Sequence, residues 1–155
     1  MITTIHLLTG AVIGKYIKNI WLIIILALIS HYILDFIPHN SPSQVKGYLE
    51  GGIKGADTKD LLIKSIDPII GLILIGYIIY LNKEKAIPLI IGIFFAWFPD
   101  LLVYFSWKFD IIWLDRIIPR PGNFFYNKSR SLIVGILTQA IAFISALILL
   151  IFPRK

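Results

Sequence analysis

Long apolar blocks alternate along the chain with short polar connections. Four blocks are clear, and they cover about residues 20–38, 61–81, 86–106 and 131–152. A helix rises about 1.5 Å per residue, so each block can cross a hydrocarbon core of about 30 Å, some of them only with ends that snorkel to the interface. The pattern therefore predicts four transmembrane helices.

The other segments are more polar. Residues 2–18 mix apolar positions with threonines, a histidine and lysines, which predicts either a fifth span or a helix half inserted beside the others. The glycine-rich stretch 40–60 predicts a loop, and residues 82–86 predict a tight turn between two antiparallel spans. Residues 107–125 combine aromatic and basic positions and contain two prolines, which predicts a helix lying in the headgroup plane.

These elements predict an all-α fold, a polytopic membrane helical bundle with four clear transmembrane helices, a short N-terminal membrane helix and an interfacial helix. We expect a single integral-membrane domain over residues 1–155. Composition agrees, because 57% of the residues are hydrophobic and 15% are charged, whereas about a quarter are charged in soluble domains. The chain has no cysteine, so a metal site would need histidine or carboxylate ligands.

The net charge of +6 indicates contact with anionic lipid headgroups. Nucleic-acid binding is not expected, because no basic stripe is long enough to follow a phosphate backbone. Alternating spans place nine lysines and arginines on the side reached after residues 20–38, and six on the other side. The positive-inside rule then puts the first side in the cytoplasm and predicts a multi-pass protein of the cell membrane.

Ionisable residues inside the apolar blocks gather at one depth. His31 and Asp35 lie late in the second segment, Asp67 lies early in the next and Asp100 lies late in the one after. If residues 2–18 cross the membrane, His6 is on the same side. An aspartate at a helix centre costs about 2.5–3.5 kcal/mol on insertion scales, so such groups usually face the bundle interior and pair. The convergence predicts one polar site in the cytoplasmic half.

The stretch S-H-Y-I-L-D-F-I-P-H carries three of these groups at four-residue steps. Residues four apart share one helix face, so His31 and Asp35 can bind the same ion. His39 lies a further turn away, but Pro38 bends or ends the helix and can swing His39 back toward the site. Alternatively, Asp35 bridges two ions. This donor set suits zinc, with manganese or iron as the alternatives.

Several candidates also have an ordinary structural role open to them. His31 could be a buried helix contact, and His39 could be an interfacial residue. Asp67 could pair with Lys64, and Asp100 could cap a helix or snorkel to the interface. His6 could lie on the surface. Asp35 is harder to explain without a cation, because an isolated carboxylate at that depth is costly.

The motifs H-Y-I-L-D…P-H from His31, H-L-L-T-G-A-V-I-G from His6, and Pro99-Asp100 resemble those of the prokaryotic membrane-bound metal-dependent hydrolases. The histidine and aspartate spacing is also similar to that of the zinc-dependent phospholipase C family. The resemblance covers about the first 40 residues and a stretch near 95–102. It implies a metal-dependent hydrolase. The chain has three histidines, so we expect one or two ions rather than a three-zinc cluster.

The predicted function is hydrolysis of a lipid ester or phosphodiester, preferably of a phospholipid, by metal-activated water. A small ion or proton transporter and a non-enzymatic membrane scaffold or regulator are the alternatives. The predicted partners are membrane lipids, and the oligomeric state is left open. The expected metal ligands are His6, His31, Asp35, His39 and Asp100, and the expected catalytic carboxylates are Asp35, Asp100 and Asp67. Arg116, Arg120 and Arg130 are expected to hold the substrate headgroup, with ordinary interfacial anchoring as their alternative role.

Overall fold

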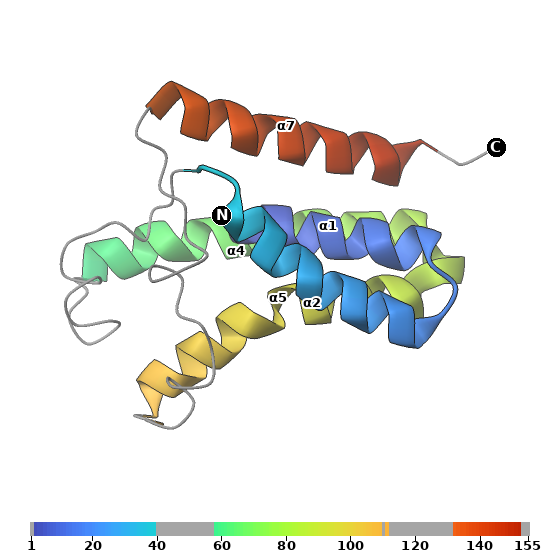
Figure 1. The fold of residues 1–155 in the computed structure, drawn as a ribbon, viewed down its shortest axis with the longest axis horizontal. Helices are drawn as coiled ribbons and strands as arrows, with labels where there is room; N and C mark the ends of the chain where they lie inside the picture. The colour runs from blue at the N-terminus through green and yellow to red at the C-terminus, as the bar shows by residue number, and fades with distance from the viewer. Residues whose placement is uncertain (1, 40–57, 110, 112–131, 153–155) are drawn as a thin grey trace.

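A computed structural model describes residues 2–39, 58–109, 111 and 132–152. Their secondary structure is entirely helical, which confirms the predicted all-α class. Figure 1 shows the arrangement of the five α-helices and one short 3₁₀ turn in this part of the chain. Their bounds are α1 Thr3–Tyr16, α2 Ile20–Phe36, α4 Thr58–Leu81, η2 Lys83–Lys85, α5 Ala86–Lys108 and α7 Leu132–Ile151.

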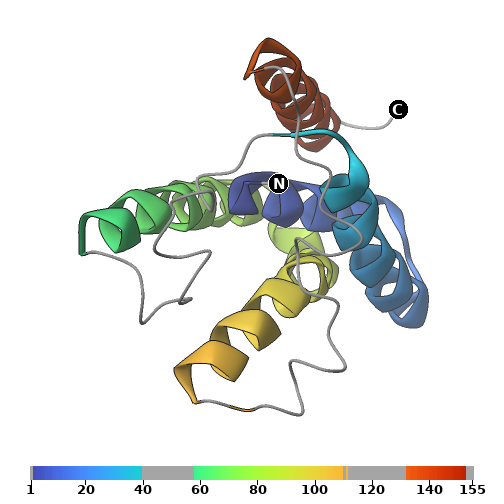
Figure 2. The ribbon, with the colours of Figure 1, turned by 60° about the vertical axis from the view of Figure 1, so that its left-hand side comes forward.

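The short helix α1 lies at the centre of the bundle. It packs against α2, α4, α5 and α7, and Figure 2 shows these helices around it. α1, α4 and α7 begin at the same end of the bundle, whereas α2 and α5 run the opposite way (Figure 1). This alternation of direction is the one that the sequence pattern predicts for successive spans.

Two of the helices are long and apolar enough to cross a membrane. They cover residues 83–106, which include most of α5, and residues 133–151 in α7. α2 has 17 residues, fewer than the roughly 20 that a full crossing needs. α4 has 24 residues and contains the whole predicted block 61–81, and its described apolar part covers residues 65–81. The prediction of four clear spans is thus confirmed for two blocks and is not shown for the other two.

Local chemistry explains where α2 begins and ends. Asn19 caps its N-terminus, because the side-chain oxygen of Asn19 accepts a hydrogen bond from the Leu22 amide at 3.2 Å. The helix stops at Phe36 because Ile37 precedes Pro38, and a residue before proline is driven out of the helical region. Ile37 accordingly has φ −67° and ψ 132°.

The predicted interfacial segment 107–125 lies almost wholly outside the described residues.

The distribution of polar side chains is the reverse of that in a water-soluble bundle. Buried positions include Thr4, Lys15, His31 and Asp35. The outer faces of α2, α4, α5 and α7 expose isoleucine, leucine, phenylalanine and tryptophan side chains, and Trp21 is 76% exposed. A helix in water would place its charged residues outside and its apolar stripe inside. This surface suits contact with hydrocarbon.

Glycines bring the backbones of α1 and α5 into direct contact. A Cβ atom added at Gly10 would overlap the carbonyl oxygen of Gly92, and one added at Gly14 would overlap the carbonyl of Pro88. A Cβ at Gly92 would in turn overlap the Gly10 carbonyl. Small residues at four-residue spacing permit this close approach, which is the usual way in which helices associate within lipid.

Helix ends are satisfied by residues of neighbouring helices. The buried Lys15 ammonium donates to the carbonyl oxygens of Leu149 and Leu150 at 3.3 and 2.5 Å, which lie at the C-terminus of α7. Lys85 donates to the Lys15 carbonyl at 3.1 Å, at the C-terminus of α1. A cation at a helix C-terminus is favourable because the last carbonyls carry partial negative charge. At the other end, Thr138 of α7 donates to the Pro38 carbonyl at 2.7 Å.

Replacement of Gly10 by alanine is expected to destabilise the fold by about 1–3 kcal/mol, because the new methyl group would push α1 away from α5. Gly76→Ala is the matched control, since no atom lies within 4 Å of a Cβ at that position. Thermal unfolding in detergent micelles should show a lower midpoint for Gly10→Ala and an unchanged or higher midpoint for Gly76→Ala. Equal midpoints would contradict the backbone contact.

Candidate metal centre

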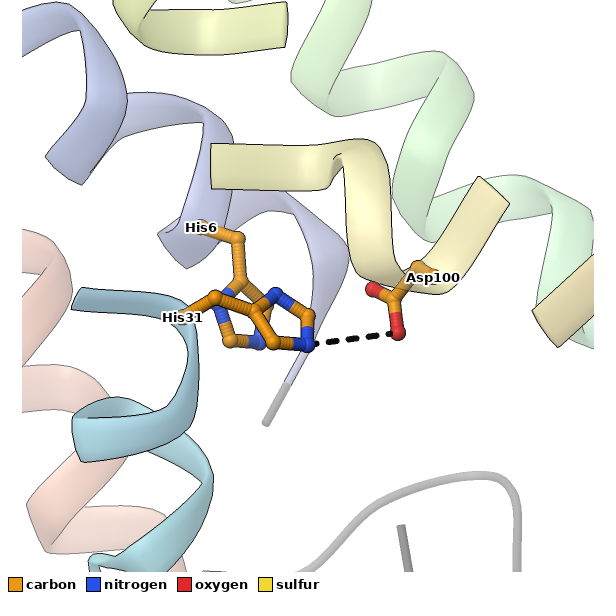
Figure 3. Close-up of side chains that lie close together, drawn as sticks. All are labelled: His6, His31 and Asp100. Atoms are coloured by element: carbon orange, nitrogen blue, oxygen red, sulfur yellow. Dashed lines mark ion pairs between the residues drawn. The ribbon is translucent and has the colours of Figure 1, made fainter. Parts of the chain in front are cut away.

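Three helices bring histidine and aspartate side chains together at one end of the bundle. His6 comes from the first turn of α1, and Asp100 follows Pro99 in α5 (Figure 3). His31 and Asp35 lie one turn apart near the end of α2. His6, His31 and Asp35 are at most 5% exposed, whereas the side chain of Asp100 is 31% exposed. Three of the four side chains are therefore buried, and the site is most accessible at Asp100.

The interatomic distances define a compact group. The Nε2 atom of His6 lies 3.3 Å from Oδ1 of Asp35, and Nε2 of His31 lies 3.5 Å from Oδ2 of the same aspartate. The same His31 nitrogen lies 3.8 Å from Oδ1 of Asp100, the contact drawn in Figure 3. The two imidazole rings stack with centroids 4.3 Å apart. Potential ligand atoms of His6, His31 and Asp100 all lie within 4.8 Å of one another, so this group could hold a metal ion.

The backbone of α5 selects the tautomer of His31. Its Nδ1 atom lies 2.9 Å from the Ala96 carbonyl oxygen. A carbonyl can only accept a hydrogen bond, so Nδ1 carries the proton and Nε2 of the neutral ring presents a lone pair to the site. A backbone carbonyl bound to the far ring nitrogen is the usual arrangement for a histidine that ligates a metal.

This lone pair points at carboxylate oxygens of Asp35 and Asp100. A lone pair and a carboxylate oxygen repel each other, so the arrangement is favourable when a cation lies between them. That cation is either a metal ion or a proton that converts His31 to imidazolium. All three contacts are longer than N–H···O hydrogen bonds of about 2.7–3.2 Å. Ligand atoms around tetrahedral zinc, with bonds of about 2.0–2.2 Å, are about 3.3–3.6 Å apart, a range that includes the two contacts of Asp35 but not the longer one of Asp100.

His6 has fewer supporting contacts than His31. Its Nε2 atom faces Asp35, and its buried Nδ1 atom has no hydrogen-bond partner among the described residues. A buried ring nitrogen without a partner costs about 1–3 kcal/mol, a cost that a functional contact of the ring can offset. The donor set of imidazole and carboxylate groups suits zinc, manganese or iron.

His39 lies close to this group but is not part of the triad of His6, His31 and Asp100. It is fully buried, and its Nδ1 atom lies 2.6 Å from the Ile37 carbonyl. Burial lowers the pKa of His39, while the negative charge of Asp35 raises it. A lowered pKa keeps the ring neutral, which is the form that a ligand requires.

Asp67 has partners of a different kind. Its carboxylate accepts hydrogen bonds from the backbone amides of Thr3 and Thr4, at 2.5 and 3.3 Å, and from the Thr4 hydroxyl at 2.6 Å. The structure thus places Asp67 at the N-terminus of α1. The alternative partner suggested by the sequence, Lys64, has a side chain outside the described part of the chain.

Other candidates also fall outside the described residues, namely the three arginines expected to bind a headgroup, Arg116, Arg120 and Arg130. Sequence reasoning overlooked the Ala96 carbonyl and the contacts of Thr3 and Thr4 with Asp67. Ala96 lies four residues before Asp100, so it shares the helix face of Asp100. That spacing is the signal that could have pointed to it.

Comparisons of the chain with protein-family models, with curated proteins and with solved structures found no match. The resemblance to membrane-bound metal-dependent hydrolases therefore stays a prediction based on short motifs. The geometry of His6, His31, Asp35 and Asp100 is the observation from which function can be argued.

Elemental analysis of the detergent-purified protein is expected to find about one or two equivalents of zinc, manganese or iron. His31→Ala and Asp35→Ala should lose the metal, because each removes a group at the centre of the cluster. Ser30→Ala is the matched control, since Ser30 precedes His31 and its hydroxyl donates to the Ala27 carbonyl of its own helix, at 2.8 Å. A folded wild type that takes up no added metal would assign a proton, rather than a metal ion, to the cluster.

Proposed function

We propose that the protein is an integral-membrane, metal-dependent hydrolase of a lipid ester or phosphodiester, with a phospholipid as the preferred substrate. The observation that carries this proposal is the convergence of His6, His31, Asp35 and Asp100 inside an apolar bundle. Zinc is the preferred ion, since histidine and carboxylate ligands with an accessible position are typical of catalytic zinc sites.

The surface of the bundle supports a lipid substrate. Two helices have the length and composition of membrane spans, and the exposed side chains of the others are largely apolar. Substrates dissolved in the bilayer can reach such a protein sideways, whereas water-soluble substrates would have to enter from the end of the bundle. Membrane lipids are therefore the proposed partners.

The depth of the site favours an enzyme over a carrier. His6 lies in the first turn of α1, and His31 and Asp35 lie in the last turns of α2, so the cluster is close to one end of the bundle. Transporters usually bind their substrate near the bilayer midplane, where both faces can have access. A site near an end is close to the plane of lipid headgroups, in which ester and phosphodiester bonds lie.

The buried residues of the cluster orient its ligands, and the most exposed one can act on water. The Ala96 carbonyl and Asp35 orient the two imidazoles, and the apolar bundle around them excludes bulk water. The most exposed member, Asp100, can reach a water molecule beside His31 and take its proton as general base. A divalent ion held by the histidines would lower the pKa of that water and polarise the phosphoryl or carbonyl oxygen.

We assign binding of the headgroup to Arg116, Arg120 and Arg130, because a guanidinium group can donate two hydrogen bonds to two phosphate oxygens.

The proposal is tested with purified protein and mixed micelles of defined phospholipids, with the products identified by mass spectrometry. Asp100→Asn is expected to reduce the rate by about 10²-fold or more, the usual contribution of a general base, because the amide has nearly the shape of the carboxylate but cannot take a proton. Asp35→Ala should abolish both metal binding and turnover. Ser30→Ala, which leaves the cluster intact, should keep the wild-type rate.

Four outcomes separate the competing functions. Product formation that depends on metal and on Asp35 supports the hydrolase. Full lipid hydrolysis by Asp35→Ala would contradict it. Metal- or proton-coupled flux into liposomes without product would favour the carrier. A metal-loaded protein with neither flux nor turnover would favour a scaffold or regulator.

A further inference from the structure

The first turn of α1 is held by another helix rather than by its own flanking residue. Ile2 precedes α1 and has no side chain that can cap it, so the first amide groups need acceptors from elsewhere. Asp67 of α4 supplies them. Its Oδ2 atom accepts from the Thr3 amide at 2.5 Å, and its Oδ1 atom accepts from the Thr4 amide at 3.3 Å. The negative charge of a carboxylate also complements the positive end of the helix dipole.

Thr4 is fixed at the same place by its side chain. Its hydroxyl lies 2.6 Å from Oδ1 of Asp67 and 2.9 Å from the Asp67 carbonyl oxygen. Gly71, one turn further along α4, leaves room for this contact. A Cβ atom at Gly71 would lie 2.8 Å from the Thr4 hydroxyl oxygen and 2.9 Å from a methyl carbon of Leu7. Asp67 and Gly71 together form the contact surface of α4 for the first turn of α1.

His6 belongs to this first turn of α1, which Asp67 and Gly71 contact. Its ring must stay within 3.3 Å of Asp35 and stack on His31 to complete the cluster. The ends of helices fray when their terminal amides lack partners, so loss of the cap would let His6 move away from two residues of α2. α4 supplies no ligand to the triad of His6, His31 and Asp100, yet it determines where one of the three stands.

We propose that Asp67 is a positioning residue that sets the place of His6 in the metal centre, an inference that rests on the proposed function. Both carboxylate oxygens of Asp67 are engaged by α1. Its influence on the site therefore passes through Thr3 and Thr4 to His6. This role differs from the ligand or general-base role that the sequence alone suggested for Asp67.

The test compares the zinc affinity of Asp67→Ala, Asp67→Asn and Lys85→Ala in detergent, by competition with a chelating dye. Loss of a residue that orients a ligand usually costs about 10–100-fold in metal affinity, so Asp67→Ala is expected to fall in that range. Asp67→Asn should recover only part of the affinity, because its amide oxygen can replace one of the two accepting oxygens, whereas its amide nitrogen cannot accept from α1. Lys85→Ala is the matched control, since it removes a cap from the other end of α1.

Thermal unfolding of the metal-free variants separates positioning from general stability. Asp67→Ala and Lys85→Ala should both lower the midpoint, but only Asp67→Ala should weaken zinc binding. Wild-type affinity in Asp67→Ala, or an equal loss in Lys85→Ala, would overturn the inference and leave the proposed function intact. A wild type that binds no zinc would overturn both.

A second variant keeps the test decisive if Asp67→Ala does not fold. Thr4→Val has the same shape as threonine but lacks the hydroxyl that contacts the side chain and the carbonyl of Asp67. Both backbone hydrogen bonds to the carboxylate remain. The expected loss of zinc affinity is therefore smaller than that of Asp67→Ala but still measurable, at several-fold. An unchanged affinity in Thr4→Val together with a poorly folded Asp67→Ala would assign Asp67 to stability alone.

Discussion

Direct backbone contact between α1 and α5 is the constraint on which the other features of the molecule depend. Gly10 and Gly92 approach so closely that neither position has room for a Cβ atom. Within lipid, helices gain no hydrophobic free energy from meeting each other, so close packing of small residues has to hold them together. This contact draws the most polar helix into the centre of the bundle. It also brings His6 and the Asp100 region of α5 to one place.

Two charges away from the site are matched by the partial charges of helix ends. Lys15 is matched by the last carbonyls of α7, and Asp67 by the first amides of α1. In both cases a charge meets a dipole of opposite sign, and the role is structural. The cluster around His31 is different, because its lone pair faces carboxylate oxygens. Groups of like polarity brought together by three helices make this cluster, rather than Lys15 or Asp67, the candidate functional site.

The supports of the site come from every helix that packs on α1. α2 supplies His31 and Asp35, α5 supplies Asp100 and the carbonyl that orients His31, and α4 holds the turn that carries His6. α7 contacts the segment before His39 through Thr138. A ligand shell that depends on long-range packing is expected to be rigid, since each ligand is fixed by a different neighbour.

The amino-acid sequence by itself determined the helical class, a bend or an end of α2 at Pro38 and the pairing of His31 with Asp35 one turn apart. It also indicated the common depth of His6, Asp35 and Asp100, because alternating chain direction relates position in a span to depth. Only the tertiary structure decided which helix faces meet. Hydrophobic residues lie on nearly all sides of these apolar helices, so their pattern in the sequence leaves the rotation of each helix about its axis undetermined. Glycine contacts and helix-end hydrogen bonds set that rotation. They bring Asp67 of α4 into contact with the N-terminus of α1, and the Ala96 carbonyl of α5 into contact with His31.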